Sequence, residues 1–132
     1  MKKVIPKGVL VVTLALLASG PGSAHHSSAM FDKTRTVTIE GTVKEFQYTN
    51  PHAWLLVVTT AADGKETVWG FECEGPSSLI RAGIRKSDFT PGTKVVVTGQ
   101  PMLDGRPAAA WVSAIRGTDN KLFSPLLGYA VK

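Results

Sequence analysis

The chain has 132 residues, a formal charge of +5 and a single cysteine. One cysteine excludes an internal disulfide, so the stability of the fold must come from packing alone. Three lysines of the amino-terminal segment (Lys2, Lys3 and Lys7) supply most of the excess charge, and residues 25–132 carry only +2. This small excess argues against nucleic acid as a partner, because phosphate recognition needs a concentrated basic surface.

The first 24 residues have the three-part pattern of a secretory signal peptide. Their basic start is followed by the apolar stretch Val9–Ala18, then by the helix-breaking Gly20-Pro21-Gly22 and a small-residue cleavage site that ends at Ala24. An apolar run of about ten residues is too short to cross a bilayer. We therefore expect residues 1–24 to be removed, which leaves a periplasmic or secreted protein without a membrane anchor.

Strand signals begin after a polar, irregular arm at residues 25–34. The segment Arg35–Tyr48 predicts one long strand, but its apolar positions are odd-numbered before Lys44 and even-numbered after it. A slip of one residue in the alternation predicts a β-bulge or a bend, and Gly41 is a second candidate bend point.

Four further strands follow, separated by turn residues. Asp63-Gly64 is a hairpin signal, and Asp119-Asn120 marks the last tight turn. In the last strand we expect Trp111 and Ile115 to share one face. Beyond the last turn, we expect residues 124–132 to form a flexible carboxyl-terminal tail. The predicted strands are Trp54–Thr60, Val68–Glu72, Lys94–Thr98 and Ala109–Arg116.

A short helix is predicted between the third and fourth strands. Gly75-Pro76 opens it, and Leu79, Ile80 and Ile84 supply its buried side. Gly83 suits the left-handed residue that closes such a helix. This order of elements predicts a mainly β fold, a single OB-like five-stranded barrel over residues 35–123, with a small open sandwich as the alternative.

Three segments form a recognisable set of motifs: the His-His-Ser-x-Ala-x-Phe-Asp start at His25–Asp32, the Thr-Asn-Pro-His-x-Trp pattern of Thr49–Trp54, and Glu74–Gly83 around the predicted helix. Together they resemble an uncharacterised family of short exported bacterial proteins with a domain of unknown function. The resemblance implies an exported barrel and no established activity. Asn120 departs from the family pattern, which has glycine in the last turn.

Three histidines are the candidate metal ligands: His25, His26 and His52. Cleavage after Ala24 would free the α-amine of His25, a group whose pKa is about 7.7–8.0. Together with imidazole nitrogens, this amine forms the nitrogen-rich set that suits Cu(II), so we expect copper before zinc. An arm of ten residues spans roughly 33 Å when extended, which allows it to reach His52.

Simpler interpretations of these histidines stay open. The first two would be solvated residues at a chain end, and His52 would be a turn residue bonded to the backbone. Cleavage at a second small-residue site, after Ala29, would remove both amino-terminal histidines. Met30 and Met102 offer thioether sulfurs to Cu(I), but methionine more often fills a core.

The remaining chemistry-bearing residues give little support for catalysis. Glu72 and Glu74 would share a strand face, where repulsion can raise one pKa, yet Glu74 also suits the start of the helix. Cys73 has two interpretations, a small buried residue or a reactive thiol. Ser77 and Ser78 read as helix-capping residues. We therefore expect that the protein is not an enzyme.

The sequence thus predicts an exported binding or accessory module. Its first candidate ligand is a transition metal, copper before zinc, and no other cofactor is expected. The alternative is a metal-free module that binds a protein or another envelope component through an aromatic barrel face around Tyr48 and Trp54.

Overall fold

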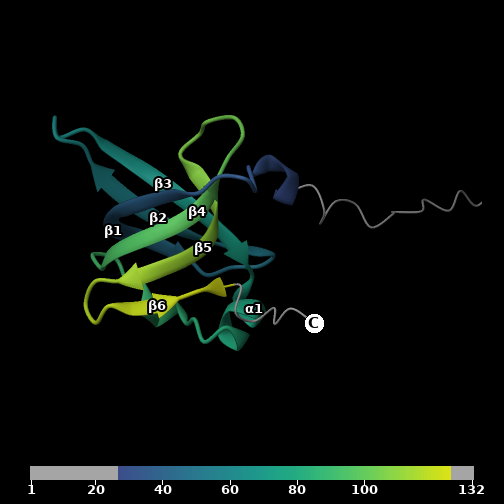
Figure 1. Cartoon of the computed structure of the whole chain (residues 1–132). Coiled ribbons are helices and arrows are strands. Elements are labelled where there is room, and N and C mark those ends of the chain that lie inside the picture. Colours follow the sequence, from purple (N-terminus) through teal and green to yellow (C-terminus); the bar gives the residue numbers. More distant parts are fainter. Residues whose placement is uncertain (1–26, 126–132) are drawn as a thin grey trace, which may run out of the picture.

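The computed structural model describes residues 27–125, whose arrangement is shown in Figure 1. The predicted signal peptide, His25, His26 and residues 126–132 lie outside the described residues. Among the residues that are described, no helix has the length and the apolar character needed to span a membrane.

Five strands close into a small barrel, with a short helix between the third and fourth of them (Figure 1). These elements are β1 (Val37–Gln47), β2 (His52–Thr60), β3 (Glu66–Glu74), α1 (Pro76–Arg81), β4 (Lys94–Pro101) and β5 (Ala108–Arg116). Antiparallel pairing runs in the order β3-β2-β1-β4-β5, and a parallel contact between Gly70–Glu72 and Ala108–Ala110 joins β3 to β5. This closure confirms the predicted OB-like barrel and excludes the open sandwich.

A bulge in β1 lets this strand serve both of its neighbours. Its first half, Val37–Thr42, pairs with β4. Its register with β2 shifts between Val43 and Glu45, which leaves Lys44 without a partner on β2. Val43 and Phe46 are consequently both buried, although one is odd-numbered and the other even-numbered. The slip in the alternation is therefore a β-bulge, as predicted.

Aromatic side chains from separate elements meet in the core. The ring of Phe89 lies 5.6 Å from that of Phe46, 5.4 Å from that of Trp111 and 4.9 Å from that of Phe123, measured between ring centroids. All three pairs are edge-to-face, a favoured arrangement for aromatic rings. Leu79 of α1 is fully buried in the same core, so the helix closes the barrel rather than standing apart from it.

Two of the three residues expected on the buried side of the helix are buried. Leu79 is fully buried, but Ile80 is 54% exposed, so the prediction for Ile80 is wrong. Consecutive residues lie about 100° apart around a helix axis, and a single turn and a half presents only one of them to the barrel. Ile84, which follows the helix, is fully buried, as predicted. Gly83, with a φ of 75°, closes the helix as predicted.

The prediction that Trp111 and Ile115 share one face of β5 is also wrong. Trp111 is 2% exposed in the core, whereas Ile115 is 41% exposed. One step along β4, from Thr98 to Gly99, corresponds to two steps along β5, so Val112 is an extra residue in a bulge. The bulge reverses the alternation between Trp111 and Ile115.

The structure adds three short elements that the sequence pattern does not predict. They are η1 (Ser27–Met30), η2 (Lys86–Asp88) and β6 (Lys121–Phe123). Beyond η1, Phe31 forms a bridge with Met102, and the N–H of Leu103 donates to the Met30 carbonyl at 2.9 Å. The described part of the amino-terminal arm is therefore packed against the turn between β4 and β5.

β6 extends the sheet beyond the closed barrel. It pairs with the carboxyl-terminal end of β5 after a turn at Asn120, whose φ of 54° lies in the left-handed region that asparagine tolerates. Of the predicted flexible tail, Ser124 and Pro125 are described. The hydroxyl of Ser124 donates to the Val112 carbonyl at 3.0 Å, and Pro125 is buried, so this part of the tail packs against the barrel.

Candidate functional site

His52 is the first residue of β2 and lies on the outer surface of the barrel. Alternate residues of this strand from Ala53 to Val57 are fully buried, so His52 and Trp54 lie on the opposite face. On the neighbouring strand β3, Glu72 lies directly opposite Trp54. The antiparallel register of the two strands therefore brings a carboxylate next to the candidate ligand.

The imidazole of His52 and the carboxylate of Glu72 are hydrogen-bonded. The Nδ1–H of His52 donates to Oε1 of Glu72, 20 residues further along the chain. The side chain of His52 is 29% exposed and that of Glu72 is 10% exposed. Because Nδ1 is engaged, Nε2 is the ring nitrogen left for a ligand, and it makes no hydrogen bond within residues 27–125.

The second oxygen of this carboxylate is buried without a partner. Oε2 of Glu72 makes no hydrogen bond to any group of the described chain. Buried polar atoms ordinarily have a partner, so this oxygen can accept a hydrogen bond from a group outside the described residues. Glu74, which pairs with His52 in the backbone register, is exposed. The two expected acids thus differ in role, because only Glu72 contacts the histidine.

Tyr48 and Trp54, the two aromatic residues of the predicted ligand face, point to different surroundings. The hydroxyl of Tyr48 donates to the Ile84 carbonyl at 2.9 Å, and its ring packs on Phe46 at 5.2 Å. Burial raises the pKa of Tyr48. Trp54 lies on the outer face over Gly70, where a Cβ atom would be 3.2 Å from the indole ring. Trp54 therefore shares its face with His52, and Tyr48 does not.

The sulfur-containing candidates lie in packed positions or on the arm. The thiol of Cys73 donates to the Ala53 carbonyl at 3.6 Å, and burial raises its pKa to about 12. A thiol with this pKa is protonated at neutral pH, which does not suit a nucleophile. Met102 is 8% exposed, and Met30 is 40% exposed. Both methionines lie where the arm attaches to the barrel.

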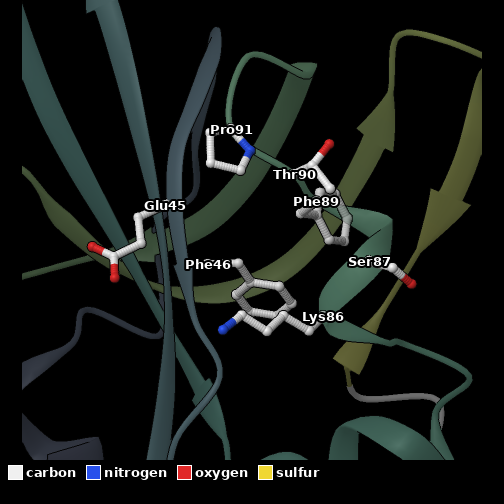
Figure 2. A pocket seen from close by; sticks show the side chains of 7 residues that line it. All are labelled: Glu45, Phe46, Lys86, Ser87, Phe89, Thr90 and Pro91. Carbon is white, nitrogen blue, oxygen red and sulfur yellow. The ribbon is translucent and has the colours of Figure 1, made fainter.

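A hollow on another part of the surface was not expected from the sequence. It has a volume of about 510 Å³ and lies between β1 and the segment around η2 (Figure 2). Phe46 and Phe89 line its floor, and Lys86 reaches across it, whereas the carboxylate of Glu45 points away. Its lining contains no histidine and no cysteine, so none of the candidate ligands from the sequence lies in this hollow.

Within residues 27–125, the barrel holds no group of three or more histidine, cysteine, aspartate or glutamate side chains that could bind a metal. His52 and Glu72 are therefore a pair and not a complete coordination sphere. The other two candidate ligands, His25 and His26, lie outside the described residues.

Comparison with known proteins assigns the chain to a family. A family model described as a family of unknown function, DUF6152, matches residues 13–110, which is well over half of the chain. The chain belongs to this family. Membership in DUF6152 agrees with the resemblance seen in the motifs and carries no activity with it. No curated protein and no solved structure shows significant similarity to this DUF6152 chain.

Proposed function

We propose that the protein is an exported metal-binding module rather than an enzyme, and that Cu(II) is its ligand. The proposed donors are Nε2 of His52 and the nitrogen atoms of His25 and His26, after cleavage behind Ala24. A histidine at the first position supplies an α-amine and an imidazole nitrogen together, and Cu(II) favours tetragonal sets of nitrogen and oxygen donors.

The observation that carries this proposal is the contact between His52 and Glu72. Histidine ligands almost always donate their other ring N–H to a carboxylate, a carbonyl or a water, which orients the ring and makes it a stronger ligand. His52 has this arrangement, with Nδ1 held by Glu72 and a partly exposed imidazole. A solvated surface histidine needs no such partner, and burying a carboxylate costs free energy.

The attachment of the arm supports a site on the barrel. The bridge between Phe31 and Met102 holds the arm against the turn between β4 and β5. His25 precedes Phe31 by six residues, and six residues span at most about 20 Å when extended. Under this proposal, so short a tether favours a chelate in which the amino-terminal donors and His52 belong to one molecule.

Titration of Cu(II) into the protein that begins at His25 tests this function. We expect His52→Ala to weaken binding at least about tenfold, with a similar loss when one extra residue before His25 blocks the α-amine. Glu72→Gln should weaken binding by about 10- to 100-fold through the orientation of His52. Glu45→Gln, which changes an exposed carboxylate of β1, is the matched control and should leave the affinity unchanged.

Equal copper affinity in all of these proteins contradicts the proposal. Amino-terminal sequencing of the exported protein is an independent check, since any first residue other than His25 removes the α-amine chelate.

A metal-free alternative is favoured by the position of Trp54. This side chain lies half-buried on the outer face of β2, next to Gly70, where an aromatic surface can contact a protein or another envelope component. Under this alternative, Trp54→Ala abolishes capture of the partner from envelope extracts, whereas His52→Ala and chelation of copper leave capture unchanged. Capture that survives Trp54→Ala contradicts the alternative.

A further inference from the structure

A gap in the strand pairing of β1 creates the hollow shown in Figure 2. The pairing of β1 with β4 ends at Thr42, and the part of β1 beyond Val43 pairs with β2 alone. The segment Lys86–Pro91 lies across from this edge and forms a short helical turn rather than a strand. The two segments are therefore not joined by a strand ladder, and about 510 Å³ stays open between them. This volume lies within the range of small-molecule sites, roughly 300–1,000 Å³.

The accessible part of the lining is mainly aliphatic. Phe46 and Phe89 form the floor, but they are only 3% and 1% exposed, so neither offers a ring face for stacking. Pro91 and the hydrocarbon stem of Lys86 are exposed beside them. A flexible aliphatic chain can follow such a surface, whereas a flat aromatic ligand gains most from an open ring face. The lining therefore favours an aliphatic ligand.

Lys86 brings a positive charge to this apolar surface. Its side chain reaches across the hollow (Figure 2), and it belongs to none of the ion pairs formed within residues 27–125. The one carboxylate of the lining is that of Glu45, which points away from the hollow and accepts a hydrogen bond from Gln47 at 3.3 Å. The charge of Lys86 is therefore left for an anion that enters the hollow.

The two hydroxyl groups of the lining add little to this charge. In Figure 2 the hydroxyl of Ser87 points away from the space, and the hydroxyl of Thr90 lies 3.2 Å from that of Thr93. A phosphate or a sugar needs several donors and acceptors around it, whereas a single carboxylate can pair with one ammonium group. The lining therefore matches a ligand that has one negative charge and an apolar remainder.

We propose that this hollow binds an aliphatic fatty acid in its ionised form. The carboxylate pairs with the ammonium group of Lys86, and the hydrocarbon chain lies along Pro91 over the buried floor. Contact with the apolar walls supplies most of the affinity, and the ion pair selects the charged end of the ligand. The hollow is separate from the proposed copper site, because neither His52 nor Glu72 lines it.

Titration of the protein with decanoate, followed by two-dimensional NMR in the presence of EDTA, tests the proposal without involving copper. We expect saturable shifts of the amides of Glu45–Phe46 and Lys86–Thr90. Lys86→Met keeps an apolar stem and removes the charge, so it should weaken decanoate binding about fivefold. The matched control is Lys65→Met, which changes an exposed lysine at the tip of the β2–β3 hairpin and should leave binding unchanged.

A charge reversal tests the role of the ammonium group. The wild type should bind decanoate more tightly than decylammonium, and Lys86→Glu should reverse this preference. Because Lys86 is exposed, both of its variants should keep the circular dichroism spectrum of the wild type.

Absence of saturable decanoate binding overturns the proposal, and so does a loss in Lys65→Met as large as that in Lys86→Met. A preference for decanoate that survives Lys86→Glu also overturns it. Ligand-free amide shifts at the hollow that change with protein concentration would assign the hollow to a second copy of the chain instead.

Discussion

Gly41 lies where β1 passes close to β2, and a larger side chain has no room there. A Cβ atom at this position would be 2.3 Å from the Val58 carbonyl oxygen and 2.7 Å from Cγ1 of Val57. At Gly70 the nearest atom would be Cε3 of Trp54, at 3.2 Å. The indole ring of Trp54 lies on the outer surface and can shift, whereas the backbone of β2 is held by both of its neighbours.

We therefore expect Gly41→Ala to lower the free energy of unfolding by about 1–3 kcal/mol, and Gly70→Ala to lower it less. Urea denaturation of the two variants and of the wild type measures this difference as a shift in the transition midpoint. If the two variants lose the same stability, the backbone of β2 yields as readily as the Trp54 ring, and the steric argument is wrong.

At the scale of an element, Arg116 holds the turn that joins β5 to β6. Its Nε and Nη2 donate to the two carboxylate oxygens of Asp119, at 3.0 and 2.7 Å. Its Nη1 donates to Oδ1 of Asp88 at 2.9 Å, and its guanidinium lies 5.0 Å from the ring centroid of Phe123. One side chain thus connects β5, η2 and β6, and the paired arrangement on Asp119 favours the ionised carboxylate.

The stability that this turn contributes should depend on pH. Hydrogen bonds from Arg116 lower the pKa of Asp119 from 3.8 to about 2. The folded protein therefore binds this proton less tightly than the unfolded chain, so the contribution is complete above pH 3.8 and is lost as the pH falls toward 2. We expect the wild type to be more stable than Asp119→Asn near neutral pH. The difference should be small, because the ion pair between Arg116 and Asp119 is partly exposed.

Urea midpoints of both proteins, followed from neutral pH down to about pH 2, measure this dependence. The difference between them should shrink below pH 3.8 and vanish near the pKa of the folded Asp119. A difference that stays constant over the whole range would show that Asp119→Asn acts through the turn geometry and not through the charge.

At the scale of the whole molecule, the closed barrel contains strands that are paired on both sides, and other segments lie outside this ring. β6 has pairing on one side only, and the tip of the β2–β3 hairpin pairs within itself, beyond the last contacts with β1 and β5. In Figure 1 this hairpin extends past the other strands. Strands in the ring must separate from two neighbours to open, whereas these segments must leave only one.

Amide hydrogen exchange should therefore be fastest within Thr59–Thr67 and Lys121–Phe123 and slowest at buried ring positions such as Val57 and Val97. Exchange followed by NMR on the protein resolves these groups of amides. Equal protection in the hairpin tip and at Val57 would mean that the molecule opens only by global unfolding.

Much of the fold was accessible from local sequence features. The change in alternation at Lys44 predicted the bulge, and the hairpin at Asp63-Gly64 has the expected left-handed glycine, with a φ of 83°. Counting outward from this hairpin pairs His52 with Glu74, which places Glu72 close to His52 as well. The contact between His52 and Glu72 could thus have been suspected, but the register alone does not decide which acid turns to the imidazole.

The sequence by itself determined the order of the strands along the chain, the position of the first bulge and the main turns. Side-chain alternation and the conformations of turn residues are properties of neighbours along the chain. Only the tertiary structure decided that His52 meets Glu72, that Tyr48 is bound to the Ile84 carbonyl, and that a second bulge separates Trp111 from Ile115. Each of these outcomes depends on a partner far away in sequence, and the packing of the closed barrel determines which partners meet.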